Sequence, residues 1–113
     1  MTTQLTLTEL HSEYEKRAFA RDWLLELPYC AIALCEESGE VAGKIKKMLR
    51  DDGGQLTSEK KQAIAEEIAD VLFYLDWTAY NLGYNLQDCY NIGAKKFDSR
   101  KSRGTLHGSG DAR

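Results

Sequence analysis

Acidic side chains at helical spacing are the residues of this sequence best suited to chemistry. They occur in two short segments, EESGE and EIAD. Residues three or four apart lie on one face of an α-helix, so Glu37 and Glu40 share a face, as do Glu67 and Asp70. Each of two helices would therefore present a pair of carboxylates.

Those faces are otherwise apolar. Glu37 lies between Leu34 and Val41 at helical spacing, and the second acidic pair interrupts a similar stripe. Crowded carboxylates at a packed interface are unfavourable, because each loses hydration and repels its neighbours. Lys44 and Lys47 could neutralise part of this charge. The arrangement nevertheless predicts a divalent cation, and an all-oxygen ligand set favours Mg²⁺, with Mn²⁺ as a substitute, over zinc or copper.

Two other interpretations apply to acidic clusters. Di-iron bundles need Glu-x-x-His pairs, and neither His11 nor His107 supplies one. A single EExxE segment is more often a solvated helix face. The second acidic pair on the next helix makes a shared metal site the better interpretation.

Capping and helix-breaking residues indicate where the first two helices lie. Thr6 and Glu9 form a capping box, which predicts a helix running to about Trp23. Pro28 fits the first turn of a second helix, and the glycine pair at 53–54 ends it.

Two further helices follow. Thr57 can cap a helix that continues to about Leu82, and Asn85 and Asp88 can cap a short one ending near Arg103. We predict an all-α, four-helix, bundle-like fold whose long second and third helices pack as an antiparallel hairpin. Because the core of so small a domain is thin, we expect oligomerisation to complete it, as a homodimer or homotetramer.

Length and composition fit one globular domain. The chain has 113 residues, 42% of them hydrophobic and 29% charged. We expect a single all-α domain over residues 1–103 and a Gly-rich tail over 104–113. No apolar run approaches the roughly 20 residues of a membrane helix, and the start lacks a secretory signal pattern. The three cysteines form no CxxC pair. These features predict a cytoplasmic protein.

Charge is uneven along the chain although the net charge is only −3. From Asn91 onward there are six Lys or Arg residues against two Asp. This segment is a candidate for binding anions. Nucleic acid is not an expected partner, because a pI near 5.4 lacks the broad basic field of a duplex binder.

The two acidic motifs together resemble the EExxE and ExxD motifs of the MazG-like family of all-α nucleoside triphosphate pyrophosphohydrolases. The resemblance extends through AIAEEIADVLFYL and the ending RGTLHGSGDAR, which looks like that of small bacterial and phage members. It covers about residues 28–113. It implies an Mg²⁺-dependent hydrolase that cleaves (d)NTP to (d)NMP and pyrophosphate.

The resemblance also implies roles for individual residues. The magnesium ligands would be Glu37, Glu40, Glu67 and Asp70, and Glu36 would orient or deprotonate the attacking water. The side chains that would contact phosphate oxygens are those of Lys96, Arg100 and Arg103, with Lys44 and Lys47 as weaker candidates. The residues that bind the base are not indicated.

Two questions stay open on the sequence alone. The aromatic side chains could include a stacking surface for a nucleobase, although core packing is the commoner role: Tyr14, Phe19, Trp23, Phe73, Tyr74 and Trp77. The tail, with His107 and Arg113, could close over phosphates.

The alternatives to an enzyme are a nucleotide-binding or sensing protein with little hydrolysis and a non-catalytic helical adaptor.

Overall fold

The computed structural model describes residues 4–17 and 22–104, and all of its regular elements are helical. The elements are α1 (Leu7–Arg17), the 3₁₀ turn η1 (Asp22–Leu25), α2 (Leu27–Asp51), α3 (Ser58–Asn81) and α4 (Leu86–Ser102). The prediction of four helices in an all-α fold is confirmed. Among the described residues, no helix has both the length and the apolarity to span a bilayer.

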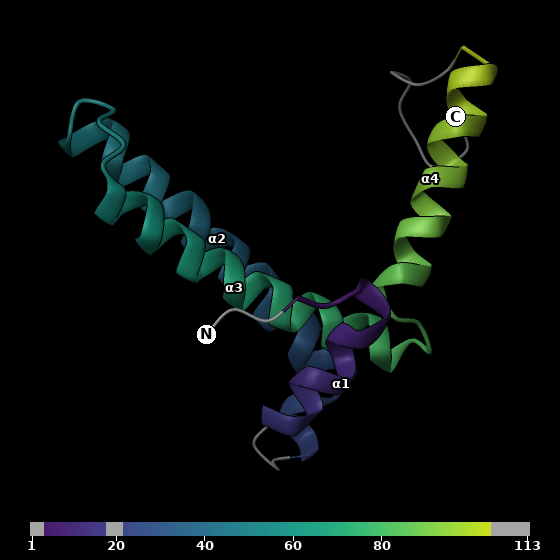
Figure 1. Cartoon of the computed structure of the whole chain (residues 1–113). Coiled ribbons are helices and arrows are strands. Elements are labelled where there is room, and N and C mark those ends of the chain that lie inside the picture. Colours follow the sequence, from purple (N-terminus) through teal and green to yellow (C-terminus); the bar gives the residue numbers. More distant parts are fainter. Residues whose placement is uncertain (1–3, 18–21, 105–113) are drawn as a thin grey trace.

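Helices α2 and α3 form a long antiparallel hairpin that dominates the molecule (Figure 1). Pro28 occupies the first turn of α2. Gly53 and Gly54 follow the helix with φ of 62° and 78°, a left-handed conformation in which a Cβ is strained. They turn the chain back toward α3, and the Thr57 side chain accepts a hydrogen bond from the Lys60 amide at its start.

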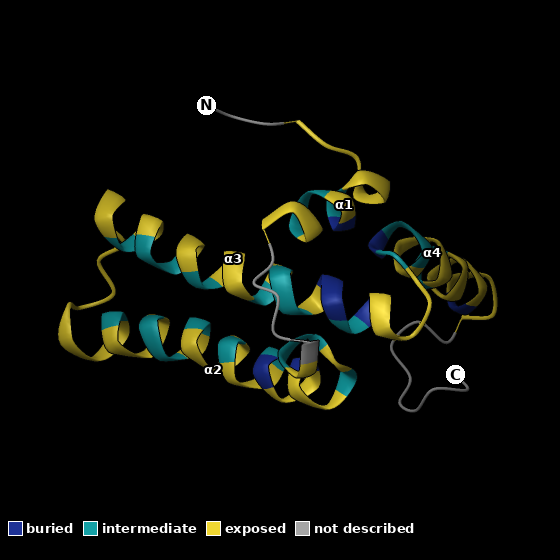
Figure 2. Ribbon diagram, turned by 90° about the horizontal axis from the view of Figure 1, so that it is seen from below, coloured by how far each residue is buried: buried dark blue, intermediate teal, exposed yellow. Residues whose placement is uncertain are grey.

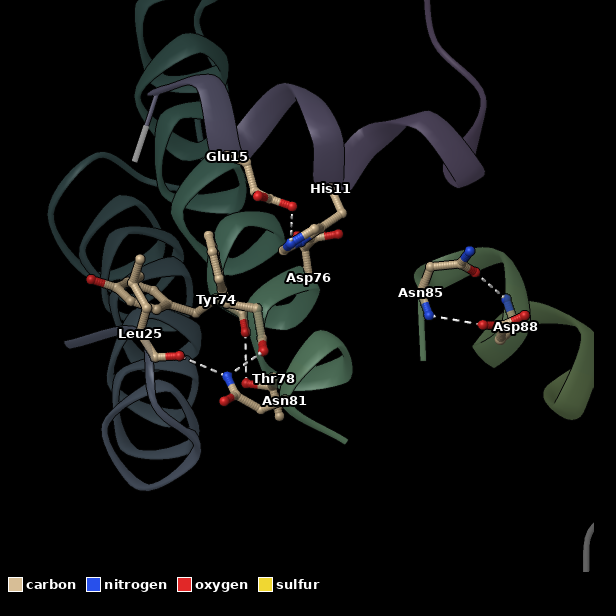
Figure 3. Close-up of polar contacts among 10 residues, drawn as sticks. His11, Glu15, Leu25, Tyr74, Asp76, Thr78, Asn81, Asn85 and Asp88 are labelled. Atoms are coloured by element: carbon tan, nitrogen blue, oxygen red, sulfur yellow. Dashed lines mark hydrogen bonds and ion pairs between the residues drawn. The ribbon is translucent and has the colours of Figure 1, made fainter. Parts of the chain in front are cut away.

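The start of helix α1 agrees with the sequence. Thr6 and Glu9 form the predicted capping box, with hydrogen bonds of 3.0 Å and 3.3 Å between side chains and backbone amides. The described part of the helix reaches Arg17, and Trp23, where we expected the helix to end, lies in the separate turn η1. Asn81 ties that turn to α3, because its Nδ2 donates to the Leu25 carbonyl at 2.7 Å (Figure 3).

Helix α4 begins with the predicted cap. Asn85 accepts a hydrogen bond from the Asp88 amide at 2.7 Å, and Asp88 accepts one from the Asn85 amide at 2.9 Å. The start of α4 packs against α1 and the end of α3. The rest of the helix projects away from the hairpin (Figure 1).

The core is small and lies at one end of the hairpin, where α1 and α4 meet α3 (Figure 2). Its buried apolar side chains are those of Cys30, Ala33, Trp77, Ala79 and Leu86. The radius of gyration is 17.1 Å, whereas a compact domain of this length has about 13 Å. A single chain therefore leaves most of its hairpin uncovered.

A buried hydrogen bond joins the first helix to this core. The Asp76 side chain is only 1% exposed, and its Oδ2 accepts a hydrogen bond from His11 Nδ1 at 2.6 Å (Figure 3). The imidazole stacks on Tyr80 with ring centroids 3.9 Å apart and meets the Trp77 ring edge-on at 4.6 Å. Glu15 Oε1 lies 3.1 Å from the other ring nitrogen. The contact fixes α1 on α3.

Candidate functional site

Three of the predicted carboxylates meet between the arms of the hairpin. One oxygen from each of Glu37, Glu67 and Asp70 lies within 4.8 Å of the other two. Helix α2 supplies the first and α3 the others, because the antiparallel pairing places the middle of α2 opposite the middle of α3. Glu37 and Glu67 are partly buried, and Asp70 is exposed. We call this group the acid triad.

The electrostatics of the acid triad favour a bound cation. Burial raises the pKa of Glu37, and the neighbouring charges of Asp70, Glu36, Glu67 and Glu40 raise it further, in that order. The ionised form of Glu37 is therefore destabilised by its surroundings. A positive charge between the carboxylates would remove that cost.

The spread of the acid triad is close to the coordination geometry that Mg²⁺ requires. Mg²⁺ holds oxygen ligands at about 2.1 Å, so two opposite ligands lie about 4.2 Å apart. The 4.8 Å spread of the three oxygens is close to this limit, and small side-chain rotations would bring them within it. All donors are carboxylate oxygens, the ligand type that a hard cation prefers.

The other two predicted acids lie beside the acid triad. Glu40 follows Glu37 by almost one turn of α2 and is exposed, and its oxygens are not among the three that converge. Glu36 is also exposed. Both act on Glu37 through their charge, so the structure places five acids in one electrostatic neighbourhood and three of them in close contact.

The predicted cations divide into two sets. Lys44 borders the acid triad, with its Nζ 3.5 Å from Glu67 Oε1. Lys47 lies further along α2, toward the hairpin loop, and is exposed. Both line a hollow between α2 and α3. Lys44 already neutralises part of the triad's charge.

The second set of cations lies on α4. Lys96 and Arg103 are exposed, and Arg100 is buried, with 6% of its surface accessible. Arg103 donates to the Ser99 carbonyl at 3.2 Å. These residues occupy the part of α4 that projects from the hairpin (Figure 1). The structure of one chain does not bring them to the acid triad.

The aromatic residues divide between core and surface. Trp77 is 8% exposed and belongs to the core, and Tyr14 packs edge-on against Phe73 with ring centroids 5.1 Å apart. Trp23 is 60% exposed and contacts Tyr29. Three further residues named from the sequence lie outside the described residues: Phe19, His107 and Arg113.

The phenol of Tyr74 on α3 lies near the acid triad. Tyr74 lies one turn after Asp70, and its pKa is raised by burial and then by the nearby Tyr29, Glu37, Cys30 and Asp70. Its ring packs edge-on against Phe73 with centroids 5.2 Å apart. Tyr74 therefore lies close to the carboxylates of Glu37 and Asp70 and also contacts the aromatic ring of Phe73.

Sequence reasoning missed two features near these residues. The first is the His11–Asp76 pair, whose signal was a single acid within the apolar run VLFYLDWTAY. A charge in such a run is buried and needs a partner. The second is Lys60 of α3, which lines the same hollow between the two helices as Lys44 and Lys47 of α2. No spacing rule relates it to the lysines of α2.

Comparison with known proteins gives two matches. Residues 29–104 match the family model of the MazG nucleotide pyrophosphohydrolase domain. The chain is also 39% identical over 87 residues to the "Gene 37 protein" of Mycobacterium phage L5, and this alignment covers 77% of the chain and 76% of the phage protein. No solved structure gives a significant match.

Proposed function

Because the chain belongs to the MazG nucleotide pyrophosphohydrolase family, we propose that it hydrolyses nucleoside triphosphates to monophosphates and pyrophosphate with Mg²⁺. The observation that carries the proposal is the acid triad of Glu37, Glu67 and Asp70, gathered from both arms of the hairpin within 4.8 Å.

The acid triad would hold the metal, and Glu40 would complete the ligand set from the next turn of α2. A bound Mg²⁺ would supply positive charge for the triphosphate oxygens and the departing pyrophosphate. Lys44, beside Glu67, adds a second positive charge at the same place. The protein thereby neutralises a polyphosphate that its own carboxylates would otherwise repel.

Glu36 would accept a proton from the attacking water. It is exposed and adjacent to Glu37 in sequence, so solvent can reach it. The water oxygen forms a bond to the α-phosphorus while the bond from that phosphorus to the bridging oxygen breaks. The electron pair leaves with pyrophosphate, and Glu36 returns its proton to solvent.

Assembly is the second part of the proposal. Ile68, Leu72 and Leu75 form one stripe of α3 at helical spacing, and all three are exposed. An apolar stripe of this kind is stabilised when a second copy covers it. We propose a homodimer or homotetramer. A phosphate-binding role for the basic residues of α4 requires such an assembly, in which α4 of one subunit approaches the acid triad of another.

The test is a panel of NTPs and dNTPs with Mg²⁺, with pyrophosphate and orthophosphate separated among the products. We expect pyrophosphate and the monophosphate in equal amounts. Asp70→Asn and Glu40→Gln should abolish turnover and leave the helical circular dichroism intact. Glu66→Gln is the matched control, because Glu66 is exposed and adjacent to the site without joining it.

The outcomes separate the three functional classes. Full activity in Asp70→Asn would reject the ligand assignment. Mg²⁺-dependent nucleotide binding without turnover would favour a sensing protein. Failure of any nucleotide to raise the melting temperature with Mg²⁺ would favour the helical adaptor, because a ligand of the folded state must stabilise it.

A further inference from the structure

A hollow with lysines at its walls lies between the arms of the hairpin, nearer its loop than the acid triad. Its volume is about 180 Å³, and α2 and α3 both contribute to its walls. It is lined by Lys44, Lys47, Met48, Asp52, Lys60, Ala63 and Ile64. We call it the lysine groove, after Lys44, Lys47 and Lys60.

The lysine groove continues directly from the acid triad. Lys44 belongs to both, since it lines the groove and its Nζ lies 3.5 Å from Glu67 Oε1. Lys60 precedes Glu67 by two turns of α3, a distance of about 10 Å along the helix axis. A bound anion could therefore extend from the carboxylates past Lys44 into the groove.

The charge of the groove is positive. Three lysines and one acid, Asp52, line it, and Lys44 also lies beside the Glu67 carboxylate of the acid triad. Asp52 Oδ2 lies 3.0 Å from Lys60 Nζ, which also donates to the Gln55 carbonyl at 3.1 Å. These contacts hold the Lys60 side chain, of which 29% is exposed, over the groove. Surface lysines usually extend separately into solvent. These three lysines come from two helices and line one hollow.

We propose that the lysine groove binds the two phosphates that leave as pyrophosphate. The orientation of the bound triphosphate rests on the function proposed above. The α-phosphate lies at the acid triad, and the β- and γ-phosphates point toward the hairpin loop. Lysine ammonium groups suit this role, because they act as point charges on phosphate oxygens. The nucleoside then points the other way, toward the end of the hairpin that α1 covers.

The experiment measures inhibition by inorganic pyrophosphate in the presence of Mg²⁺ at about 0.15 M salt, where distant surface charges are screened. We expect Lys47→Gln/Lys60→Gln to raise the inhibition constant of pyrophosphate by about tenfold or more. The inhibition constant of the nucleoside monophosphate should change less than about twofold. Lys60→Arg keeps the charge and should keep the inhibition.

The chain offers a matched control one residue away on each helix. Lys46→Gln/Lys61→Gln removes the same net charge from exposed positions that do not line the groove. Pyrophosphate inhibition should be unchanged in this variant. Equal losses in both double variants would overturn the proposal, because general electrostatic attraction would then account for them.

Calorimetric titration of the whole protein with Mg²⁺ and pyrophosphate separates this proposal from the proposed function. Binding that the groove variant weakens, in a protein that hydrolyses no nucleotide, would support the groove and reject the hydrolase. Hydrolysis with unaltered pyrophosphate binding in Lys47→Gln/Lys60→Gln would reject the groove and retain the hydrolase.

Discussion

Replacing Glu37 by glutamine should stabilise the metal-free protein and remove its stabilisation by Mg²⁺. Glu37 is the partly buried member of the acid triad on α2, and burial and four neighbouring acids raise its pKa. Glutamine has nearly the same shape but carries no charge. The substitution therefore removes repulsion while preserving the packing between the arms of the hairpin.

The size of the effect follows from the distances. Two unit charges at the 4.8 Å spread of the acid triad repel by about 1 kcal/mol in water and about 3.5 kcal/mol at an effective dielectric constant of 20. Asp70 is exposed and Lys44 offsets part of the charge of Glu67. We therefore expect a net gain of about 1 kcal/mol, or about 4 °C in melting temperature for a domain of this size.

The pH dependence has a defined sign. The folded-state pKa of Glu37 lies above its ordinary value of 4.5, so the folded protein binds this proton more tightly than the unfolded chain does. The repulsion is absent below pH 4.5 and grows as the pH rises through the folded-state pKa. The stability difference between the variant and the wild type should follow the same course.

The assay is thermal unfolding in EDTA and again in Mg²⁺, at one fixed protein concentration because assembly also affects stability. Glu66→Gln, an exposed substitution next to Glu67, should change neither value. A Glu37→Gln protein that is less stable than wild type in EDTA, or that keeps the full rise in Mg²⁺, would refute the reasoning. Either result would mean that Glu37 is not repelled within a metal-binding group.

Three further predictions concern the fold. His11→Ala leaves the Asp76 carboxylate buried without its partner, and should lower the free energy of unfolding in urea by about 3 kcal/mol. Asn85→Ala removes the hydrogen bond to the Asp88 amide and should cost about 1 kcal/mol, measured in the same way. Leu72→Asp places a charge in the exposed apolar stripe of α3 and should shift the protein to monomers in light scattering; an unchanged mass would exclude that stripe from the interface.

Local sequence signals were sufficient for most of the helix boundaries. These signals depend on residues within one turn, so their effect can be read without knowing the tertiary structure. They are the caps at Thr57 and Asn85, the proline in the first turn of α2 (Pro28), and the glycine pair 53–54 that ends α2. The end of α1 has no such signal. Its apolar pattern continues toward Trp23, but that residue lies in the separate turn η1.

The candidate site was predictable to the extent that helical periodicity controls it. Spacing placed Glu67 and Asp70 on one face, and hairpin pairing brought Glu37 to them. Spacing could not decide whether Glu40 would converge with the others, because that depends on the rotation of α2 about its axis. The direction of α4 was also beyond a local signal, since it follows from the Gly83 turn and from packing against α1.

The His11–Asp76 contact bears on where a minimal working fragment can be cut. The match to the family model starts at residue 29, but α1, which precedes it, supplies the imidazole that hydrogen-bonds to the buried Asp76 carboxyl group in the core. A truncation at that boundary would leave the Asp76 carboxyl group buried beside Trp77 without its partner. It would also remove the imidazole ring that packs against the Trp77 indole. The smallest autonomously folding piece should therefore include the first helix, and expression trials of such truncations should yield insoluble material unless Asp76 is changed at the same time.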